Sequence, residues 1–156
     1  FSPMHDVGKI GIPDNILRKP SKLNTAEFDV MKTHPEKGRE IIDSVLEDFS
    51  LGTFGHANIL RNIAEYHHEA IDGSGYPKGL KGDEIPIEAR ISAVADVFDA
   101  LTSRRSYKAA WSNEDAFTML RQMANSKLDR DCVEALINSA EKILEIQQRF
   151  RDNDLI

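Results

Sequence analysis

The stretch MHDVGKIGIPD, residues 4–14, places a histidine beside an aspartate and a lysine shortly after them. His5 offers an imidazole nitrogen, Asp6 offers two carboxylate oxygens that can bridge two metal ions, and Lys9 is a cation one helical turn beyond His5. A hydrolytic metal centre needs these three parts. A His-Asp pair alone is a weak signal, because both side chains are common at protein surfaces. The rest of the chain therefore decides whether this pair binds metal.

The sequence around this stretch predicts helices. Residues 1–8 suit the last turns of a helix, and Pro13 ends any helical run. Asn24 followed by Glu27 is typical of a helix start, and so is Ser112 with an acidic residue three positions later. No segment alternates convincingly with period two, so the predicted fold class is all-α. Further helices are predicted over 36–47, from Ala57 to residues 66–69, over 87–102, where apolar residues including Ile91 and Ala95 recur at helical spacing, and from near Asp131 onward as one helix.

Length and composition limit the classes of protein. At 156 residues, the chain suits one domain, residues 1–156, with room for a hydrophobic core. The formal charge of −6 argues against DNA as a partner, because duplex binding needs clustered cations, whereas a small phosphorylated ligand needs only local ones. Cys132 is the only cysteine, which excludes an intramolecular disulfide and fits a reducing cytoplasm. The sequence has no apolar run long enough for a membrane span.

Four of the five histidines, together with Asp6 and Asp96, form a candidate ligand set without sulfur, which suits Fe, Mn or Zn. Asp96 lies on an otherwise apolar helix, where a carboxylate is costly without a cation. His56 lies in a region without a motif and is interpreted as structural. The segment 72–86 is rich in glycine and proline, and a long loop in a compact domain is more often functional than idle.

Several motifs occur together in a fixed order along most of the chain. They are HD at 5–6, GKIGIPD at 8–14, HPEKG at 34–38, HHE at 67–69, DGSGYPKGLKG at 72–82 and ARISAVADVFDALTSRRSYK at 89–108. In this combination the chain resembles the HD-GYP family, bacterial cyclic di-GMP phosphodiesterases that form a branch of the HD metal-dependent phosphohydrolases. The resemblance implies an HD-type helical bundle with a Gly-rich GYP loop.

The resemblance also assigns roles to residues of this chain. Asp6 and Lys9 take the catalytic roles, and Arg105 and Lys108 hold the phosphate of the ligand. The GYP tripeptide, Gly75-Tyr76-Pro77, belongs to the loop beside the pocket, and Tyr76 is a candidate for substrate contact or for simple loop packing. Asp99 is a candidate for orienting a histidine ligand. The implied metal ligands are His5, Asp6, His34, His67, His68 and Asp96.

The implied reaction is hydrolysis of cyclic di-GMP to pGpG, GMP or both by a hydroxide that bridges the metal ions. The implied cofactors are two or three divalent ions, with Fe or Mn favoured. The implied partners are diguanylate cyclase domains and a sensory or receiver domain in a longer parent. Family domains begin with a helix that carries a further histidine and, in three-metal members, a glutamate. The domain is therefore expected to be N-terminally truncated, with that helix or helices missing.

Two alternatives remain open. A catalytically incompetent module would act as a cyclic di-GMP sensor or as a docking surface for a cyclase domain, and a sensor would not need His5. An HD phosphohydrolase acting on another nucleotide is the third reading, although the GYP loop and the positions of Arg105 and Lys108 speak against it.

Overall fold

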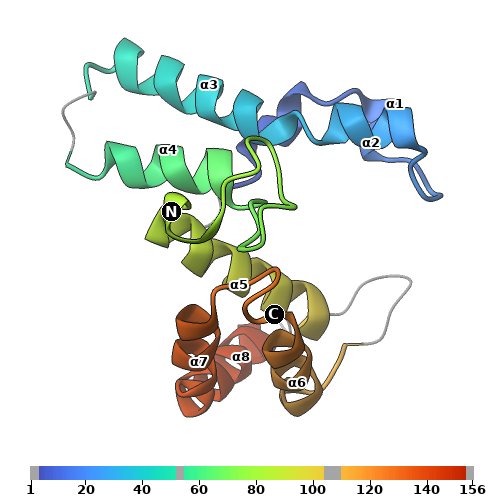
Figure 1. Ribbon diagram of the computed structural model, residues 1–156, viewed down its shortest axis with the longest axis vertical. Coiled ribbons are helices and arrows are strands. Elements are labelled where there is room, and N and C mark those ends of the chain that lie inside the picture. The colour runs from blue at the N-terminus through green and yellow to red at the C-terminus, as the bar shows by residue number, and fades with distance from the viewer. Residues whose placement is uncertain (1–3, 52–54, 104–109, 154–156) are drawn as a thin grey trace.

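The computed structural model of the chain describes residues 4–51, 55–103 and 110–153, and these residues form helices and turns without a β-strand. The prediction of an all-α fold is confirmed. Figure 1 shows α3 and α4 side by side at one end, α5 across the middle, and α6, α7 and α8 at the opposite end. The elements are η2 Val7–Gly11, α1 Asp14–Leu17, α2 Thr25–Met31, α3 His34–Asp48, α4 Ala57–Tyr66, η3 Gly82–Glu84, α5 Ile87–Thr102, α6 Asn113–Met123, α7 Arg130–Ile137 and α8 Ala140–Asn153.

The segment that carries the His-Asp pair differs from the expected helix end. Met4 has 3-10 geometry, and His5 and Asp6 form a turn that leads into the 3-10 helix η2, so the described part of this segment is not α-helical. The reason is its close approach to α3. A Cβ atom on Gly8 would overlap the carbonyl oxygen of His34 and the amide of Gly38, so glycine allows η2 to lie directly against α3. This contact brings Asp6 next to the start of α3.

The two helix starts that the sequence predicted by capping are confirmed. The Asn24 side chain accepts a hydrogen bond from the Glu27 amide (2.9 Å), and the Glu27 carboxylate accepts one from the Asn24 amide (2.8 Å). The Ser112 hydroxyl accepts a hydrogen bond from the Asp115 amide at the start of α6. These caps satisfy amides that have no partner within their own helix.

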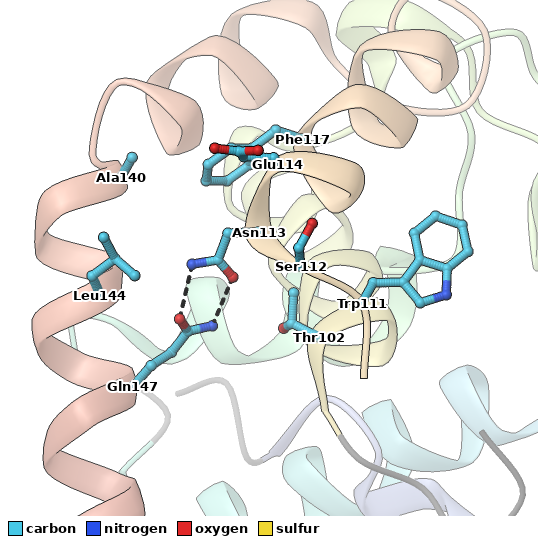
Figure 2. A pocket seen from close by; sticks show the side chains of 9 residues that line it. All are labelled: Thr102, Trp111, Ser112, Asn113, Glu114, Phe117, Ala140, Leu144 and Gln147. Carbon is cyan, nitrogen blue, oxygen red and sulfur yellow. Dashed lines mark hydrogen bonds between the residues drawn. The ribbon is translucent and has the colours of Figure 1, made fainter. Parts of the chain in front are cut away.

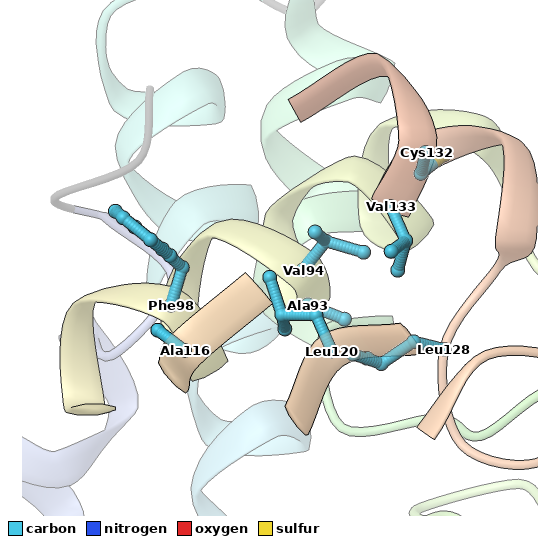
Figure 3. Close-up of a cluster of buried hydrophobic side chains, with 8 residues drawn as sticks. All are labelled: Ala93, Val94, Phe98, Ala116, Leu120, Leu128, Cys132 and Val133. Atoms are coloured by element: carbon cyan, nitrogen blue, oxygen red, sulfur yellow. The ribbon is translucent and has the colours of Figure 1, made fainter. Parts of the chain in front are cut away.

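The second half of the molecule, α5 to α8, surrounds one apolar cluster (Figure 3). Val94 and Phe98 of α5 pack there against Leu120 of α6 and Val133 of α7. The helix predicted over 87–102 is confirmed as α5, and two residues of the apolar pattern that predicted it are exposed, Ile91 (55%) and Ala95. The helix packs against α4 as well as against α6 and α7, and these two residues line an open groove that α5 forms with α7 and Ile143 of α8.

The predicted last helix is two helices. A turn separates α7 from α8, in which the Ser139 amide donates to the Leu136 carbonyl (3.0 Å). After this turn α8 lies beside α6, where the side chains of Asn113 and Gln147 donate to each other (2.9 and 3.1 Å; Figure 2). A hollow lined also by Trp111 and Phe117 lies at this contact, at the opposite end of the molecule from α3 and α4. Among the described residues, no helix is long and apolar enough to cross a bilayer.

Candidate metal centre

Four of the predicted ligands meet at one point. Asp6 precedes η2, His34 begins α3, and His67 and His68 follow the last residue of α4. Each contributes an atom that could bind a metal ion, and these atoms lie within 4.8 Å of one another. We call these four residues the metal cluster. The α3–α4 pair therefore brings together ligands that are more than 30 positions apart in the sequence.

The two carboxylate oxygens of Asp6 face different groups. Oδ1 lies 3.4 Å from His34 Nε2 and 3.8 Å from His67 Nε2, on the side of the metal cluster. Oδ2 lies 3.3 Å from His5 Nε2 and 2.5 Å from Lys9 Nζ. Asp6 thus stands between two groups of nitrogen atoms, which is the arrangement that a bridging carboxylate needs.

The histidines present acceptor atoms to one another. His34 Nδ1 lies 2.8 Å from the Met31 carbonyl, and His67 Nδ1 lies 3.0 Å from the Ile63 carbonyl. A carbonyl only accepts, so in the neutral rings Nδ1 carries the proton and Nε2 has a lone pair. The two Nε2 atoms are nevertheless 3.4 Å apart and beside Asp6 Oδ1, a buried oxygen that accepts no hydrogen bond from the described residues. A cation between these atoms would satisfy all three, so the residues fit a divalent metal ion.

Burial keeps two ligands in the form that binds metal. Desolvation, with a smaller contribution from neighbouring histidines, lowers the pKa of His67 to about 4 and that of His68 to about 3. Burial acts to raise the pKa of Asp6, but contacts with His34, His5 and Lys9 outweigh it and hold that pKa well below the usual carboxyl range. At neutral pH His67 and His68 are therefore neutral and Asp6 is ionised, which are the forms that bind a metal ion.

The other two predicted ligands lie beside the metal cluster. His5 Nε2 is 3.3 Å from Asp6 Oδ2 and 3.7 Å from Asp96 Oδ1, on α5, so His5 lies close to both carboxylates. Asp99 lies one turn further along α5 and is exposed, and its Oδ1 accepts a hydrogen bond from the Ser103 hydroxyl (2.9 Å). Its role in orienting a histidine stays a prediction.

Comparison with known proteins agrees with this geometry. Residues 2–132 match the model of a family described as HD domain. The chain belongs to the HD domain family. The relatives it matches carry names that agree with the HD-GYP resemblance, and the family is one of metal-dependent phosphohydrolases.

Three relatives illustrate the similarity. A "Cyclic di-GMP phosphodiesterase response regulator" of Xanthomonas campestris pv. campestris is 46% identical over 96% of this chain and 38% of its own length. A "Probable cyclic di-GMP phosphodiesterase" of Vibrio cholerae is 43% identical over 98% of this chain and 34% of its own length. A "3'3'-cGAMP-specific phosphodiesterase 2" of Vibrio cholerae is 41% identical over 97% of this chain and 28% of its own length. The chain spans about a third of the length of these relatives.

The tyrosine of the GYP loop, residues 72–82, lies against the metal centre of this HD domain. The Tyr76 ring is stacked on His68, with centroids 4.8 Å apart, and meets the edge of the Phe28 ring at 6.4 Å. Burial, and then the charges of Asp6 and Asp96, raise the pKa of Tyr76 to about 12, so the phenol remains a hydrogen-bond donor at neutral pH. Gly75 and Pro77 flank it in the same loop.

Some residues stand apart from these predictions. Arg105 and Lys108 lie outside the described residues, so their phosphate-binding roles stay predictions. His56 directly precedes α4 and is not part of the metal cluster. Sequence reasoning gave no role to Phe28, which borders Tyr76, or to Glu69, whose buried carboxylate contacts the GYP loop. The HHE motif contains Glu69, but a motif letter alone does not indicate which atoms the carboxylate contacts.

Proposed function

We propose that this HD domain is a phosphodiesterase that hydrolyses cyclic di-GMP to pGpG, GMP or both. The observation that carries the proposal is the position of Asp6 between His34 and His67 on one side and His5 and Lys9 on the other. The names of the relatives above supply the substrate class.

The cofactors proposed are two or three divalent ions, Fe or Mn. The metal cluster would hold one ion, and His5, Asp6 and Asp96 would contribute to a second. Bound divalent ions polarise the phosphoryl group and lower the pKa of water at neutral pH. Oxygen and imidazole ligands without thiolate suit these metals.

The chain's own residues would act on the phosphodiester as follows. Asp6 keeps its negative charge, because its pKa lies far below neutrality, and so orients the nitrogen ligands around it. Lys9 Nζ, which lies 2.5 Å from Asp6 Oδ2, is placed to stabilise negative charge that develops in the transition state or to protonate the leaving oxygen. Tyr76 covers His68 and would bound the substrate pocket.

A cyclic GMP-AMP dinucleotide is the second candidate substrate, because one relative of 41% identity is named as specific for 3'3'-cGAMP. Both substrates contain the same cyclic phosphodiester chemistry, so the metal centre does not distinguish them. The proposed partners are a diguanylate cyclase domain and a receiver or other sensory domain in a longer parent. The proposed compartment is the cytoplasm, where Cys132, a free and buried thiol, would stay reduced.

The test compares the wild-type chain with Asp6→Asn for metal content and for turnover of cyclic di-GMP and 3'3'-cGAMP. Asp6→Asn should lower turnover of the true substrate about a thousandfold and reduce bound metal. Asp29→Asn is the control, because Asp29 is an exposed aspartate that pairs with Lys32 on α2, and its rates should equal wild type. Wild-type chain that binds cyclic di-GMP without turnover would contradict the enzyme and support the sensor.

A further inference from the structure

The residue that follows His67 and His68 has an unusual set of partners. Glu69 is only 5% exposed, and its carboxylate accepts hydrogen bonds from three consecutive backbone amides of the GYP loop. Oε1 accepts from Lys78 (2.7 Å) and Gly79 (3.1 Å), and Oε2 accepts from Leu80 (3.0 Å). An ionised carboxylate is costly to bury without partners, and three amide donors compensate its charge. Glu69 thus contacts the loop and not the metal ligands.

The loop also touches this segment on the other side of Tyr76. The Tyr76 amide donates to the His68 carbonyl (3.2 Å). A Cβ atom on Gly75 would overlap the backbone of Glu69 and Ala70, so the loop passes directly over these residues. Tyr76 is therefore held from both directions, by backbone contact before it and by the Glu69 carboxylate two to four residues after it.

The position of the ring depends on these contacts. One face of Tyr76 lies on His68, and Phe28 of α2 meets it edge to face. Phe28 is 46% exposed, so it confines the ring weakly from outside. Without the Glu69 hydrogen bonds, residues 78–80 would have three amides to satisfy with water, and the loop would be free to lift Tyr76 from His68.

We infer that Glu69 is a positioning residue that acts through Tyr76: its carboxylate fixes the GYP loop so that the tyrosine forms one wall of the substrate pocket. The inference rests on the phosphodiesterase function proposed above. It predicts that loss of the Glu69 charge weakens substrate binding while the metal content stays the same, because the ligand His67 keeps its own contacts with the Ile63 and Ala64 carbonyls of α4.

A double-mutant cycle with Tyr76 separates positioning from general stabilisation. Glu69→Gln keeps the size of the side chain but replaces an acceptor with a donor that would face a backbone amide. We expect it to raise KM for cyclic di-GMP at least about tenfold, with metal content unchanged by elemental analysis. Tyr76→Ala should raise KM similarly, and the double variant should be no worse than Tyr76→Ala within about threefold. Multiplied losses in the double variant would overturn the inference, as would wild-type KM in Glu69→Gln.

Two further variants serve as controls. Glu134→Gln makes the same change in a carboxylate on α7, at the opposite end of the molecule, which pairs with Arg121 (3.2 Å), so KM should change less than about twofold. Glu69→Asp is the variant to use if Glu69→Gln does not fold. It keeps the charge but shortens the side chain by one methylene, so its KM should lie between that of the wild type and that of Tyr76→Ala. A KM for Glu69→Asp equal to wild type would also overturn the inference.

Dissociation constants distinguish the failure of this inference from that of the proposed function. If the wild-type chain binds cyclic di-GMP without hydrolysing it, the enzyme proposal fails, and the same cycle run on Kd decides the role of Glu69. Additive losses in Kd would then contradict the positioning role, and non-additive losses would support it. Absence of binding by the wild type would overturn both.

Discussion

The half of the molecule formed by α5 to α8 and the half formed by η2, α3, α4 and the GYP loop bury different chemistry. The first encloses apolar side chains such as Val94, Leu120 and Val133 (Figure 3). The second has a small apolar cluster around Ile42 and Leu46, and its other buried side chains include His34, His67 and Glu69. One half is stabilised chiefly by burial of apolar surface, and the other needs charged and polar partners.

This contrast explains what each half does. Apolar packing needs no ligand, so α5 to α8 form a scaffold whose packing does not depend on a metal ion and which carries Asp96 on α5. Imidazoles whose Nε2 atoms face one another at 3.4 Å are unfavourable without a cation. The metal-binding half should therefore become more stable when a metal ion binds, because an ion that binds the native state and not the unfolded chain stabilises the native state.

The largest expected effect of a single substitution on stability is in the scaffold. Leu120 is fully buried in the apolar cluster, so Leu120→Ala should lower the free energy of unfolding by about 3 kcal/mol through lost burial and a cavity. The metal affinity of the protein that remains folded should be unchanged within about twofold, because α6 does not contribute to the centre. Urea unfolding and metal titration measure the two effects.

The matched control is Ile91→Ala on α5, because this side chain is as large but more than half exposed. Its cost in unfolding free energy should be below about 1 kcal/mol. A large loss of metal affinity in Leu120→Ala, with the protein still folded, would contradict the division of the molecule into scaffold and metal centre.

The second effect is a loss of stability in acid that belongs to the metal-binding half. The pKa of His67 is lowered to about 4 and that of His68 to about 3, whereas both would return to about 6.5 on unfolding. Between these values the unfolded chain binds more protons, so stability falls as pH falls from about 6.5 toward 4. In the metal-free protein, each histidine lowers the free energy of unfolding by about 1.4 kcal/mol for each pH unit of acidification in this range.

His68→Gln tests this assignment. The variant removes one of the two titrating groups, so the slope of unfolding free energy against pH should be about half that of the wild type. Urea unfolding of metal-free protein across this pH range gives the slope. An equal slope in the variant and the wild type would show that other groups cause the acid sensitivity.

The same contrast between the halves decides what could be predicted from sequence. Helix starts with local signals were predictable, as at Asn24 and Ser112, because the capping side chain bonds an amide two or three residues away. The break between α7 and α8 was not, since neither glycine nor proline marks it and the apolar period runs through it. The exposure of Ile91 depends on which neighbours α5 packs against, which is tertiary information.

For the site, the order of motifs predicted which side chains gather, and the structure brings Asp6, His34, His67 and His68 together. The order of motifs could not predict the tautomers of His34 and His67. These depend on the backbone carbonyls of Met31 and Ile63, which lie beside Nδ1 of the two rings. Nor could it predict that Glu69, the third letter of HHE, contacts the loop, since its partners are backbone amides, which no side-chain pattern indicates.

The smallest expected effect is the loss of an exposed ion pair in the scaffold, in contrast to the loss of a more buried arginine in the metal-binding half. Arg121 and Glu134 join α6 to α7 at 3.2 Å, with side chains 56% and 41% exposed, so Arg121→Met should cost less than about 0.5 kcal/mol. Arg39 joins Glu65 (2.8 Å) and Asp43 (2.7 Å), and Glu65 is 11% exposed. Arg39→Met should cost about 2 kcal/mol, because it leaves a mostly buried carboxylate without its guanidinium. The difference should also persist in high salt, which screens exposed pairs more than buried ones. Equal costs in urea unfolding would mean that the metal-binding half depends no more on its charged pairs than the apolar scaffold does.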